Sequence, residues 1–399
     1  MKVLFLTNYP APYRVDFFNM LGQKVELTVA FTDNPEMQAH RSAKWFIDDY
    51  SSFHAVFLKD KQQIGKIKIC RDVISLLQKQ YDQIIFGGYS TGTQMYAIEY
   101  LRRKKIPFAI EADGGMVKEE SLISYRIKRH FIGSANAWLS TGTVTTDYFL
   151  HYGAKKESIY LYPLSSQKKS EIVMAREFLN EFSEKPNTKN QLSENELSLH
   201  RKIISEKLLD IKRLAQETLK IKESRVILFV GQLIYRKGID VLLHAAKYIP
   251  NDIAVLIVGG KPTEEYLSIK KELQLDHVYF EDFLVKKDLE KYYQAADLFV
   301  MPTREDIWGL VINEAMSYGL PIVSTDRCVA AMELVENNVN GLIVPADDAD
   351  ALAKGIMHVL SADLREMGQQ SMKKISGYTI EKMVEAHMDF FEKMKRKKD

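Results

Sequence analysis

Short, continuous apolar runs recur along the chain, each followed by a polar or glycine-containing turn and then by residues with helical spacing. In the first part of the chain these runs are "KVLFLTN", "VELTVAFT", "QIIFGG", "PFAIEADGG", "AWLSTG" and "IYLYPL". Strands that are apolar at every position, rather than at alternate positions, are typical of a parallel sheet covered by helices on both faces. The pattern therefore predicts an α/β domain over residues 1–164.

The pattern changes after this first domain. Residues 165–222 are rich in Lys, Glu, Gln, Asn and Ser and have weak helical periodicity, which predicts a polar helical linker or insertion. Strand-like runs then return in "RVILFVGQ", "IAVLIVGG", "HVYFEDF", "DLFVMPT", "LPIVST" and "NGLIVPA" and predict a second α/β domain over 223–378. A helical pattern over 379–399 follows, and we expect this helix to pack back on the first domain. The prediction is two Rossmann-like domains with parallel sheets facing a cleft, whose ligands bind beyond the carboxyl ends of the strands.

Composition narrows the class of protein. With 46% hydrophobic and 27% charged residues among 399, the chain is typical of a soluble globular protein, and its net charge of +2 gives no reason to expect nucleic acid as a partner. Cys70 and Cys328 lie far apart in sequence, which favours neither a disulfide framework nor a cysteine-based zinc site and suits the cytoplasm. No apolar run is long enough to cross a bilayer, so we expect any membrane association to be peripheral.

The stretch "TREDIWGLVINEAMSYGLPIVST" carries two acids just beyond the apolar run "DLFVMP". Asp306 falls in the loop after the expected strand, and Glu314 falls in the first turns of the helix that follows. The amides of Gly309 and Leu310, at the start of that helix, can receive an anion. Two such acids can contact two parts of one ligand; the alternative is a surface ion pair and an ordinary loop or capping acid.

A second candidate site lies in "FVGQLIYRKGIDVLLHAA". A strand ends before Gly231, which permits close approach of the backbone, and Arg236 and Lys237 stand just before an amphipathic helix. Cations and helix amides at this position suit a diphosphate. The alternative is a solvated turn with two exposed cations.

The first of these stretches resembles the signature of glycosyltransferase family 4, which comprises retaining enzymes of the GT-B fold. Its motif is Glu-x7-Glu followed by a Gly-x-Pro turn, and Asp306 and Glu314 take the two acidic positions. The resemblance implies that Asp306 contacts the hydroxyls of the donor sugar and that Glu314 binds the ribose hydroxyls of the nucleotide. Asp in place of Glu shortens the reach of the first acid by one methylene.

The second stretch is similar to the family motif Gly-Arg-Leu-x3-Lys-Gly, whose Arg and Lys hold the diphosphate. The chain keeps Gly231 and Lys237 but has Gln232 where the family has Arg. We hypothesise that Arg236 supplies the missing charge. The resemblance implies that Lys237 stabilises the diphosphate as leaving group.

Two further loops complete the predicted site through the same resemblance. The segment "VYFEDFLVKKDLEKYY" is similar to the one that flanks the nucleobase, here at Phe283 and Leu284. In the first domain, many family members have a His after the strand that here reads "FAIEADGGM", near the anomeric carbon of the donor. Either Asp113 or Glu111 takes its place, and we count Asp113 with Asp306 as a candidate catalytic residue.

The segment "SYRIKRHFIGSANAWL" sets Arg126, Lys128, Arg129 and His130 among apolar residues. A basic amphipathic helix of this kind can lie on an anionic membrane surface, where a lipid-linked acceptor would be found. A solvated helix face is the alternative explanation.

Taken together, the resemblance implies a retaining glycosyltransferase of the hexosyltransferase type. It would move a sugar from a UDP- or GDP-sugar donor to a sugar or lipid-linked acceptor, in bacterial surface polysaccharide synthesis. Lys237 and Arg236 would stabilise the departing diphosphate, so we expect no metal or other cofactor. The alternatives are a nucleotide-sugar epimerase or another GT-B nucleotide-binding protein. A dinucleotide-dependent oxidoreductase is disfavoured because no strand is followed by Gly-x-Gly-x-x-Gly.

Overall fold

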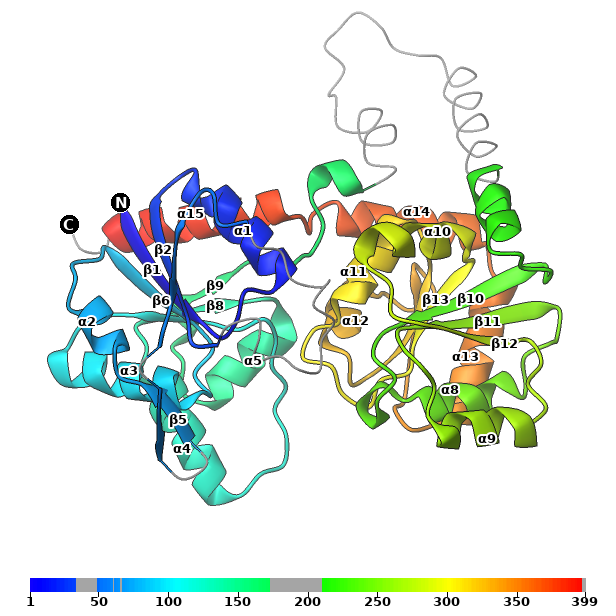
Figure 1. Ribbon diagram of the computed structural model, residues 1–399, viewed down its shortest axis with the longest axis horizontal. Helices are drawn as coiled ribbons and strands as arrows, with labels where there is room; N and C mark the ends of the chain where they lie inside the picture. Colours follow the sequence, from blue (N-terminus) through cyan, green and yellow to red (C-terminus); the bar gives the residue numbers. More distant parts are fainter. Residues whose placement is uncertain (34–48, 60, 65–66, 173–209, 397–399) are drawn as a thin grey trace, which may run out of the picture. The chain divides into compact units, whose positions relative to one another are not determined.

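The computed structural model describes residues 1–33, 49–59, 61–64, 67–172 and 210–396. They form two compact units (Figure 1): the first comprises Met1–Lys168 with Tyr378–Asp399, and the second comprises Lys169–Gly377. Most of the predicted polar segment 165–222 lies outside the described residues. Of the remainder, residues 210–218 are helical.

The first unit is built on a parallel sheet with the strand order β3-β2-β1-β6-β7-β8-β9. Its strands are β1 (Lys2–Thr7), β2 (Glu26–Phe31), β3 (His54–Phe57), β6 (Gln83–Gly87), β7 (Ala109–Glu111), β8 (Ala137–Ser140) and β9 (Ile159–Leu161). A separate antiparallel hairpin is formed by β4 (Lys61–Ile64) and β5 (Ile67–Cys70). Strand order reverses at β1, which has β2 on one side and β6 on the other, and loops that bind ligands are expected at such a reversal.

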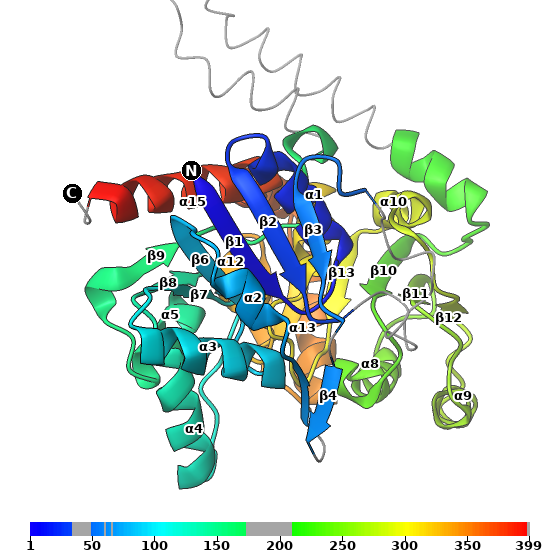
Figure 2. The same ribbon diagram turned by 60° about the vertical axis from the view of Figure 1, so that its left-hand side comes forward.

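Helices cover both faces of this sheet, which explains why its strands are apolar at every position (Figure 2). The helices of the unit are α1 (Pro12–Gly22), α2 (Val73–Leu77), α3 (Gly92–Lys104), α4 (Leu122–Ile132), α5 (Thr143–His151) and α15 (Ile380–Arg396). On one face, Leu4 and Leu6 share a buried cluster with residues of α2, α3 and α5. On the other, the ring of Phe5 lies 6.2 Å from that of Phe17 in α1 and 6.0 Å from that of His387 in α15.

The second unit is a parallel sheet with the strand order β12-β11-β10-β13-β14-β15. Its strands are β10 (Arg225–Val230), β11 (Ile253–Val258), β12 (Val278–Glu281), β13 (Leu298–Met301), β14 (Ile322–Thr325) and β15 (Gly341–Val344). In chain order this is the arrangement 3-2-1-4-5-6 of a Rossmann fold, in which the switch point lies between the first and fourth strands. The switch point of this unit is therefore the pair β10 and β13.

Helices again cover both faces. They are α8 (Ile239–Ala246), α9 (Glu264–Glu272), α10 (Lys286–Ala295), α11 (Leu310–Ser317), α12 (Val329–Leu334), α13 (Ala349–Ser361) and α14 (Leu364–Ile375). Ile227 and Phe229 of β10 share a buried cluster with α8, α9 and α13, whereas Phe299 of β13 meets Tyr293 of α10 at a ring separation of 6.1 Å. Two parallel sheets, each covered on both faces, confirm the predicted fold class of two Rossmann-like domains.

The last helix, α15, belongs to the first unit and packs against α1 (Figure 2). The amide of Ile380 donates to the carbonyl of Gln167 at 2.9 Å where the chain re-enters this unit. Phe390 and Phe391 are each 1% exposed. Burial of these aromatic side chains, rather than helix propensity alone, holds α15 in place. In the part of the chain that the structure describes, no helix combines the length and apolar character needed to cross a bilayer.

Replacing Phe390 by Ala should destabilise the first unit by roughly 3–5 kcal/mol, because the cavity is added to the lost burial of the ring. Hydrogen exchange of β1 and α1 amides, measured in the native protein, reports this unit by itself. Glu392→Ala changes a side chain on the same helix that is 66% exposed and should leave the exchange of β1 unchanged. Equal protection of β1 in Phe390→Ala and wild-type protein would show that α15 does not stabilise the sheet.

Candidate active site

The two motifs of the second unit meet at its switch point. Lys237 follows β10, Asp306 follows β13, and their side chains form an ion pair between Nζ and Oδ2. Both side chains are largely buried, at 11% and 14% exposed. Nη1 of Arg236 lies 3.7 Å from Oδ1 of the same carboxylate. Two cations thus face one acid at the carboxyl ends of the central strands, where a Rossmann-like sheet binds its ligand.

The turn before α8 places Lys237. A 3-10 turn, η5 (Tyr235–Lys237), ends at Gly238, whose φ of +69° is left-handed. A Cβ at Gly238 would lie 2.0 Å from the carbonyl oxygen of Pro302, so only glycine allows the turn to lie this close to the end of β13. Close approach of the two segments brings Lys237 within reach of Asp306.

Backbone hydrogen bonds fix the loop that carries Asp306. Its amide donates to the carbonyl of Arg327 at 2.8 Å, and its carbonyl accepts from the amide of Val329 at 3.2 Å. The indole Nε1 of Trp308 donates to Oδ1 of Asn313 at 2.9 Å, and both side chains are buried. The carboxylate is therefore held on a loop that is hydrogen-bonded both to the segment after β14 and to α11.

Gly309 and Leu310 stand at the start of α11, as predicted from the sequence. Gly309 is the N-cap residue with a φ of +104°, and a Cβ there would lie 2.9 Å from Sγ of Cys328. Burial raises the pKa of the Cys328 thiol to about 12, so this side chain is a neutral packing group rather than a nucleophile.

Glu314 lies on α11, and a buried tyrosine orients it. The hydroxyl of Tyr293 donates to Oε2 of Glu314 at 2.9 Å. Burial and the nearby carboxylate raise the pKa of Tyr293 well above its usual value, so the hydroxyl remains a donor. The Tyr293 ring stacks on Tyr318 with centroids 5.2 Å apart and planes 7° apart. Tyr293 was not predicted, because an aromatic residue on an amphipathic helix looks like any other core residue.

Arg304 is a second residue of this site that was not predicted. Its guanidinium donates to both carboxylate oxygens of Asp240, at 2.9 and 2.6 Å, and to the carbonyl of Tyr235 at 2.7 Å. Burial acts to raise the pKa of Asp240, but the hydrogen bonds and charge of Arg304 hold it below its usual value. Its position directly after β13 is a signal that could have identified it, since site residues of such sheets follow strand ends.

The remaining residues predicted to bind the sugar donor lie at the same edge of the sheet. Gly231 follows β10, and a Cβ on Gly259 would come within 1.9 Å of its carbonyl oxygen, so the two loops are in close contact. Gln232 is exposed, Phe283 is 39% exposed and Leu284 is half-buried. Phe283 and Leu284 follow β12, which is separated from β10 by β11. They lie to one side of the Lys237–Asp306 pair.

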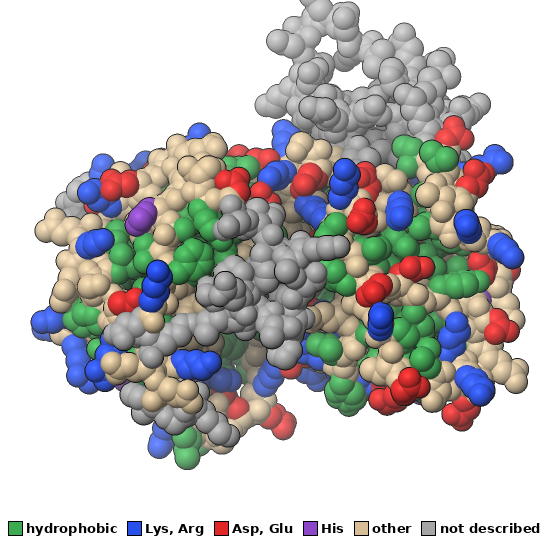
Figure 3. All heavy atoms as spheres, viewed as in Figure 1, with side chains coloured by type: hydrophobic (Ala, Val, Ile, Leu, Met, Phe, Trp, Pro, Cys, Tyr) green, Lys and Arg blue, Asp and Glu red, His purple; other side chains and the backbone are tan. Residues whose placement is uncertain are grey.

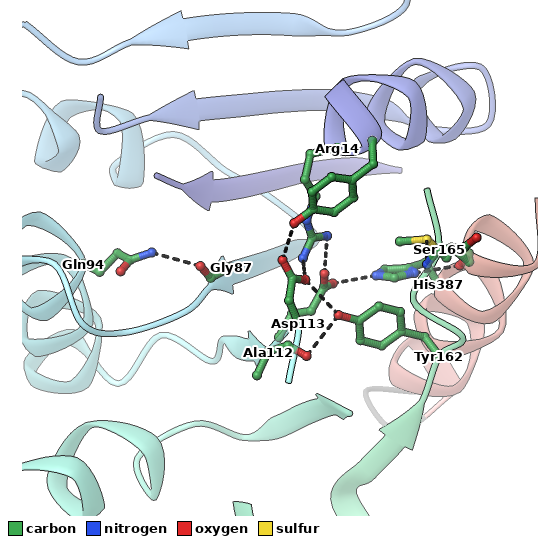
Figure 4. Close-up of polar contacts among 11 residues, drawn as sticks. Arg14, Gly87, Gln94, Ala112, Asp113, Tyr162, Ser165 and His387 are labelled. Carbon is green, nitrogen blue, oxygen red and sulfur yellow. Dashed lines mark hydrogen bonds and ion pairs between the residues drawn. The ribbon is translucent and has the colours of Figure 1, made fainter. Parts of the chain in front are cut away.

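In the first unit, Glu111 and Asp113 both form ion pairs with Arg14. Figure 4 shows Arg14, Asp113, Tyr162 and His387 of this network. Glu111 is fully buried between the Arg14 guanidinium and Nε2 of His387, the latter at 2.7 Å. Asp113 forms an ion pair with Arg14 and accepts hydrogen bonds from the hydroxyls of Tyr13 at 2.6 Å and Tyr162 at 3.2 Å. Of the two acids proposed to replace the family His, Asp113 reaches solvent, with 33% of its side chain exposed, and Glu111 does not.

The charges of this network compensate one another. Burial acts to raise the pKa of Glu111, but the positive charges of Arg14 and His387 lower it to about 2. His387 faces an acceptor at each ring nitrogen, because Nδ1 lies 2.7 Å from the carbonyl of Met383. Arg14 thus meets both carboxylates of the network, and His387 meets Glu111.

Within the ranges that the structure describes, no group of three or more His, Cys, Asp or Glu side chains is arranged to hold a metal ion. In the second unit, Lys237 and Arg236 bring positive charge to the switch point beside Asp306. The two units, each a parallel sheet covered by helices, have the architecture of the GT-B fold.

Comparison with known proteins shows what this chain is similar to. Residues 210–376 match the family model described as glycosyl transferases group 1. An uncharacterized glycosyltransferase of Methanocaldococcus jannaschii is 34% identical over 143 residues, which cover 35% of this chain and 36% of the relative. The O-antigen chain mannosyltransferase C of Escherichia coli is 26% identical over 172 residues, 41% of this chain and 45% of the relative. The chain thus spans between a third and a half of the length of these relatives.

Solved structures extend the likeness to the whole fold. Anabaena HepE, solved in complex with UDP, superposes with a TM-score of 0.73 over 98% of this chain and 100% of that chain, at 16% identity. HepE has also been solved with UDP-glucose. At this identity the likeness concerns the fold alone, and it confirms the predicted GT-B architecture.

The buried network generates a prediction about acid stability. The folded pKa of Glu111, about 2, lies below the usual value of 4.5, so its contribution is complete above pH 4.5 and is lost as the pH falls toward 2. This difference corresponds to roughly 3 kcal/mol. Urea unfolding at a series of pH values should show that Glu111→Gln lowers stability near pH 7 and weakens its loss between pH 4.5 and 2.

Glu26→Gln, in which the replaced side chain is 68% exposed, should keep the pH dependence of the wild-type protein. An identical slope in Glu111→Gln and wild-type protein would mean that the Glu111 charge does not stabilise the fold.

Proposed function

We propose that this protein is a retaining glycosyltransferase that transfers a hexose from a UDP- or GDP-sugar to a hydroxyl of a sugar or lipid-linked acceptor. The observation that carries the proposal is the pairing of Lys237 with Asp306 at the switch point of a group 1 domain. A diphosphate needs cations and amide donors, and a sugar needs carboxylates, at one place.

The ion pair gives the donor two partners at once. A diphosphate beside α8 would accept hydrogen bonds from Lys237 and replace the Asp306 carboxylate as its counter-charge. The carboxylate would then be available to the hydroxyls of the donor sugar. Arg236, whose side chain is 42% exposed, would add a second cation. Binding would thus exchange one charge pair for another instead of leaving a buried charge uncompensated.

Glu314 is proposed to bind the ribose hydroxyls of the nucleotide. Its carboxylate accepts the Tyr293 hydroxyl at Oε2, and this contact orients the acid before a ligand arrives. Phe283 and Leu284, in the loop after β12, are proposed to flank the nucleobase beside Gly231 and Gln232. The amides of Gly309 and Leu310 would serve the sugar end of the donor.

The proposed chemistry depends on leaving-group stabilisation. As the bond from the anomeric carbon to the diphosphate breaks, negative charge grows on the β-phosphate, and Lys237 with Arg236 would stabilise it. The acceptor hydroxyl would lose its proton as the phosphate leaves and attack the same face of the sugar, which retains the configuration. Asp306 would position the sugar in this scheme and would not act as a nucleophile.

Asp113 is proposed to act on the acceptor side, in the place that a His takes in many members of the family. Its contacts with Tyr13, Arg14 and Tyr162 fix its orientation, and a third of its side chain is exposed. Glu111 instead has both its partners in the interior. Of the two acids, Asp113 is therefore the one assigned to that place in this proposal.

The proposed pathway is synthesis of a bacterial surface polysaccharide in the cytoplasm. The similarity to an O-antigen chain mannosyltransferase supports this assignment. Acceptors of this kind are often carried on lipid, which would place the enzyme on the inner face of the plasma membrane. Helix α4 is the element proposed to meet that membrane.

Apolar and basic side chains lie together on α4. Leu122, Ile123 and Ile127 are 61%, 72% and 46% exposed, and Arg126 and Arg129 are exposed beside them. In the space-filling view, hydrophobic and basic side chains lie next to each other at the end of the first unit where Figure 1 shows α4 (Figure 3). Helices of this type bury an apolar stripe among lipid headgroups while their cations meet anionic lipids.

Two of the four basic residues predicted for this face have a carboxylate partner within the protein. Lys128 forms an ion pair with Glu120 at 2.8 Å and donates to the hydroxyl of Tyr152 at 3.3 Å. Nε2 of His130 lies 3.3 Å from a carboxylate oxygen of Glu99. The cations proposed to meet lipid are therefore Arg126 and Arg129.

Nucleoside diphosphates test the proposed reaction class. UDP or GDP at 100 times its dissociation constant should stabilise the folded protein by about 2.7 kcal/mol, measured as a rise in Tm, and ADP and NAD should not. Lys237→Ala and Glu314→Ala should abolish the rise, whereas Lys354→Ala, on the exposed face of α13, should keep it. Stabilisation by NAD alone, or by none of these nucleotides, would contradict the proposal. A stabilising UDP-sugar that is converted to its epimer without an acceptor would favour the epimerase alternative.

Vesicles test the membrane assignment. Ile123→Ser should weaken binding to phosphatidylglycerol-containing vesicles about 10-fold, since roughly 1.5 kcal/mol of apolar burial is lost, with Tm unchanged because the side chain is exposed. Leu214→Ser replaces a side chain of the second unit that is 65% exposed and should bind as the wild-type protein does. Sedimentation with vesicles measures both. Equal binding by Ile123→Ser and wild-type protein would exclude α4 as the contact.

A further inference from the structure

We propose that Arg304 is a positioning residue for the diphosphate site, because it holds the turn that carries Arg236 and Lys237. This inference rests on the function proposed above and names a residue that the family motifs do not include. Lys237 can meet Asp306 or a phosphate only if η5 stays against the end of β13. Thr303 and Arg304 contribute contacts that keep it there, alongside the hydrogen bond from Nη1 of Arg236 to the carbonyl of Glu305 at 2.6 Å.

The backbone carbonyl groups of η5 accept hydrogen bonds from Thr303 and Arg304. The carbonyl of Arg236 accepts from the amide of Arg304 and from the hydroxyl of Thr303, each at 2.9 Å. The carbonyl of Tyr235 accepts from Nη1 of Arg304 at 2.7 Å. The guanidinium also lies over the Tyr235 ring, 3.9 Å from its centroid. Two consecutive residues of η5 are thus bound to the residues that follow β13.

Arg304 also fixes the first turn of α8. Its two terminal nitrogens bind both carboxylate oxygens of Asp240 in a bidentate pair. Nε forms a further ion pair with Asp347, in the loop before α13. One side chain therefore joins the turn, the start of α8 and a third loop, and it remains only 13% exposed.

These partners separate the role of Arg304 from that of Lys237. Two carboxylates already meet the guanidinium, so its charge is compensated within the protein. Arg236 and Lys237 share one carboxylate, Asp306, and have charge to offer a phosphate. Arg304 acts through the turn and not by contact with the ligand. A lysine could not replace it, because a single ammonium cannot make the bidentate pair and the ring contact together.

The test uses Arg304→Lys, which keeps the positive charge but removes the guanidinium that forms the bidentate pair. Hydrogen exchange of the free protein should show amides of residues 235–239 exchanging at least 5-fold faster, with β1 amides of the first unit unchanged. Dissociation constants are then measured for UDP against uridine and for GDP against guanosine. The affinity for the diphosphate should fall about 10-fold while that for the matching nucleoside stays the same, because the base and ribose are bound elsewhere.

Lys212→Met is the matched control. Lys212 pairs with Asp297, which precedes β13, so the variant breaks an ion pair of the same unit at the opposite end of the same strand. It should lower Tm without changing the ratio of diphosphate to nucleoside affinity. A parallel loss of both affinities in Arg304→Lys, or unchanged exchange of residues 235–239, would overturn the proposal. If wild-type protein binds neither UDP nor GDP, the proposed function fails, and the exchange measurement alone decides whether Arg304 holds the turn.

Discussion

The second unit depends on the pairing of β10 with β13. These strands are far apart in the chain but adjacent in the sheet, so the segments that follow them start side by side. Three features of the candidate site use this adjacency: the approach of Gly238 to Pro302, the pairing of Lys237 with Asp306, and the contacts of Arg304 with η5. A parallel sheet brings polar groups together at its carboxyl edge while its apolar faces remain covered.

The first unit contains a buried carboxylate that must be compensated. It buries the carboxylate of Glu111 (β7) away from water and compensates it with the guanidinium of Arg14 (α1) and a hydrogen bond from His387 (α15). Removing charges from water is costly unless they are paired and hydrogen-bonded. The network therefore joins the sheet to α15 by specific polar contacts, in addition to the aromatic packing around Phe5 and Phe17.

The sequence was sufficient to predict most strands of the two sheets and the positions of the two motifs, because continuous apolar runs and residues that follow strands are local features. It did not predict β3, or the hairpin of β4 and β5, which contains no continuous apolar run. Nor did it predict the partners of the residues that follow strands. Glu111 and His387 are separated by 276 positions, and no local pattern relates them. Likewise, Tyr293 and Arg304 act through side-chain orientation, which depends on packing. The pairing of Lys128 with Glu120 arises in the same way, and a helical periodicity could not distinguish it from a basic face.

The chain leaves the first unit after Lys168 and returns to it at Tyr378. During synthesis on the ribosome, the second unit is therefore complete before α15 exists, whereas the first unit must wait until α15 has been made. Until then Glu111 lacks His387, and the surface of α1 that will meet α15 remains uncovered. The nascent first unit is thus the part of the molecule that chaperones have most reason to bind.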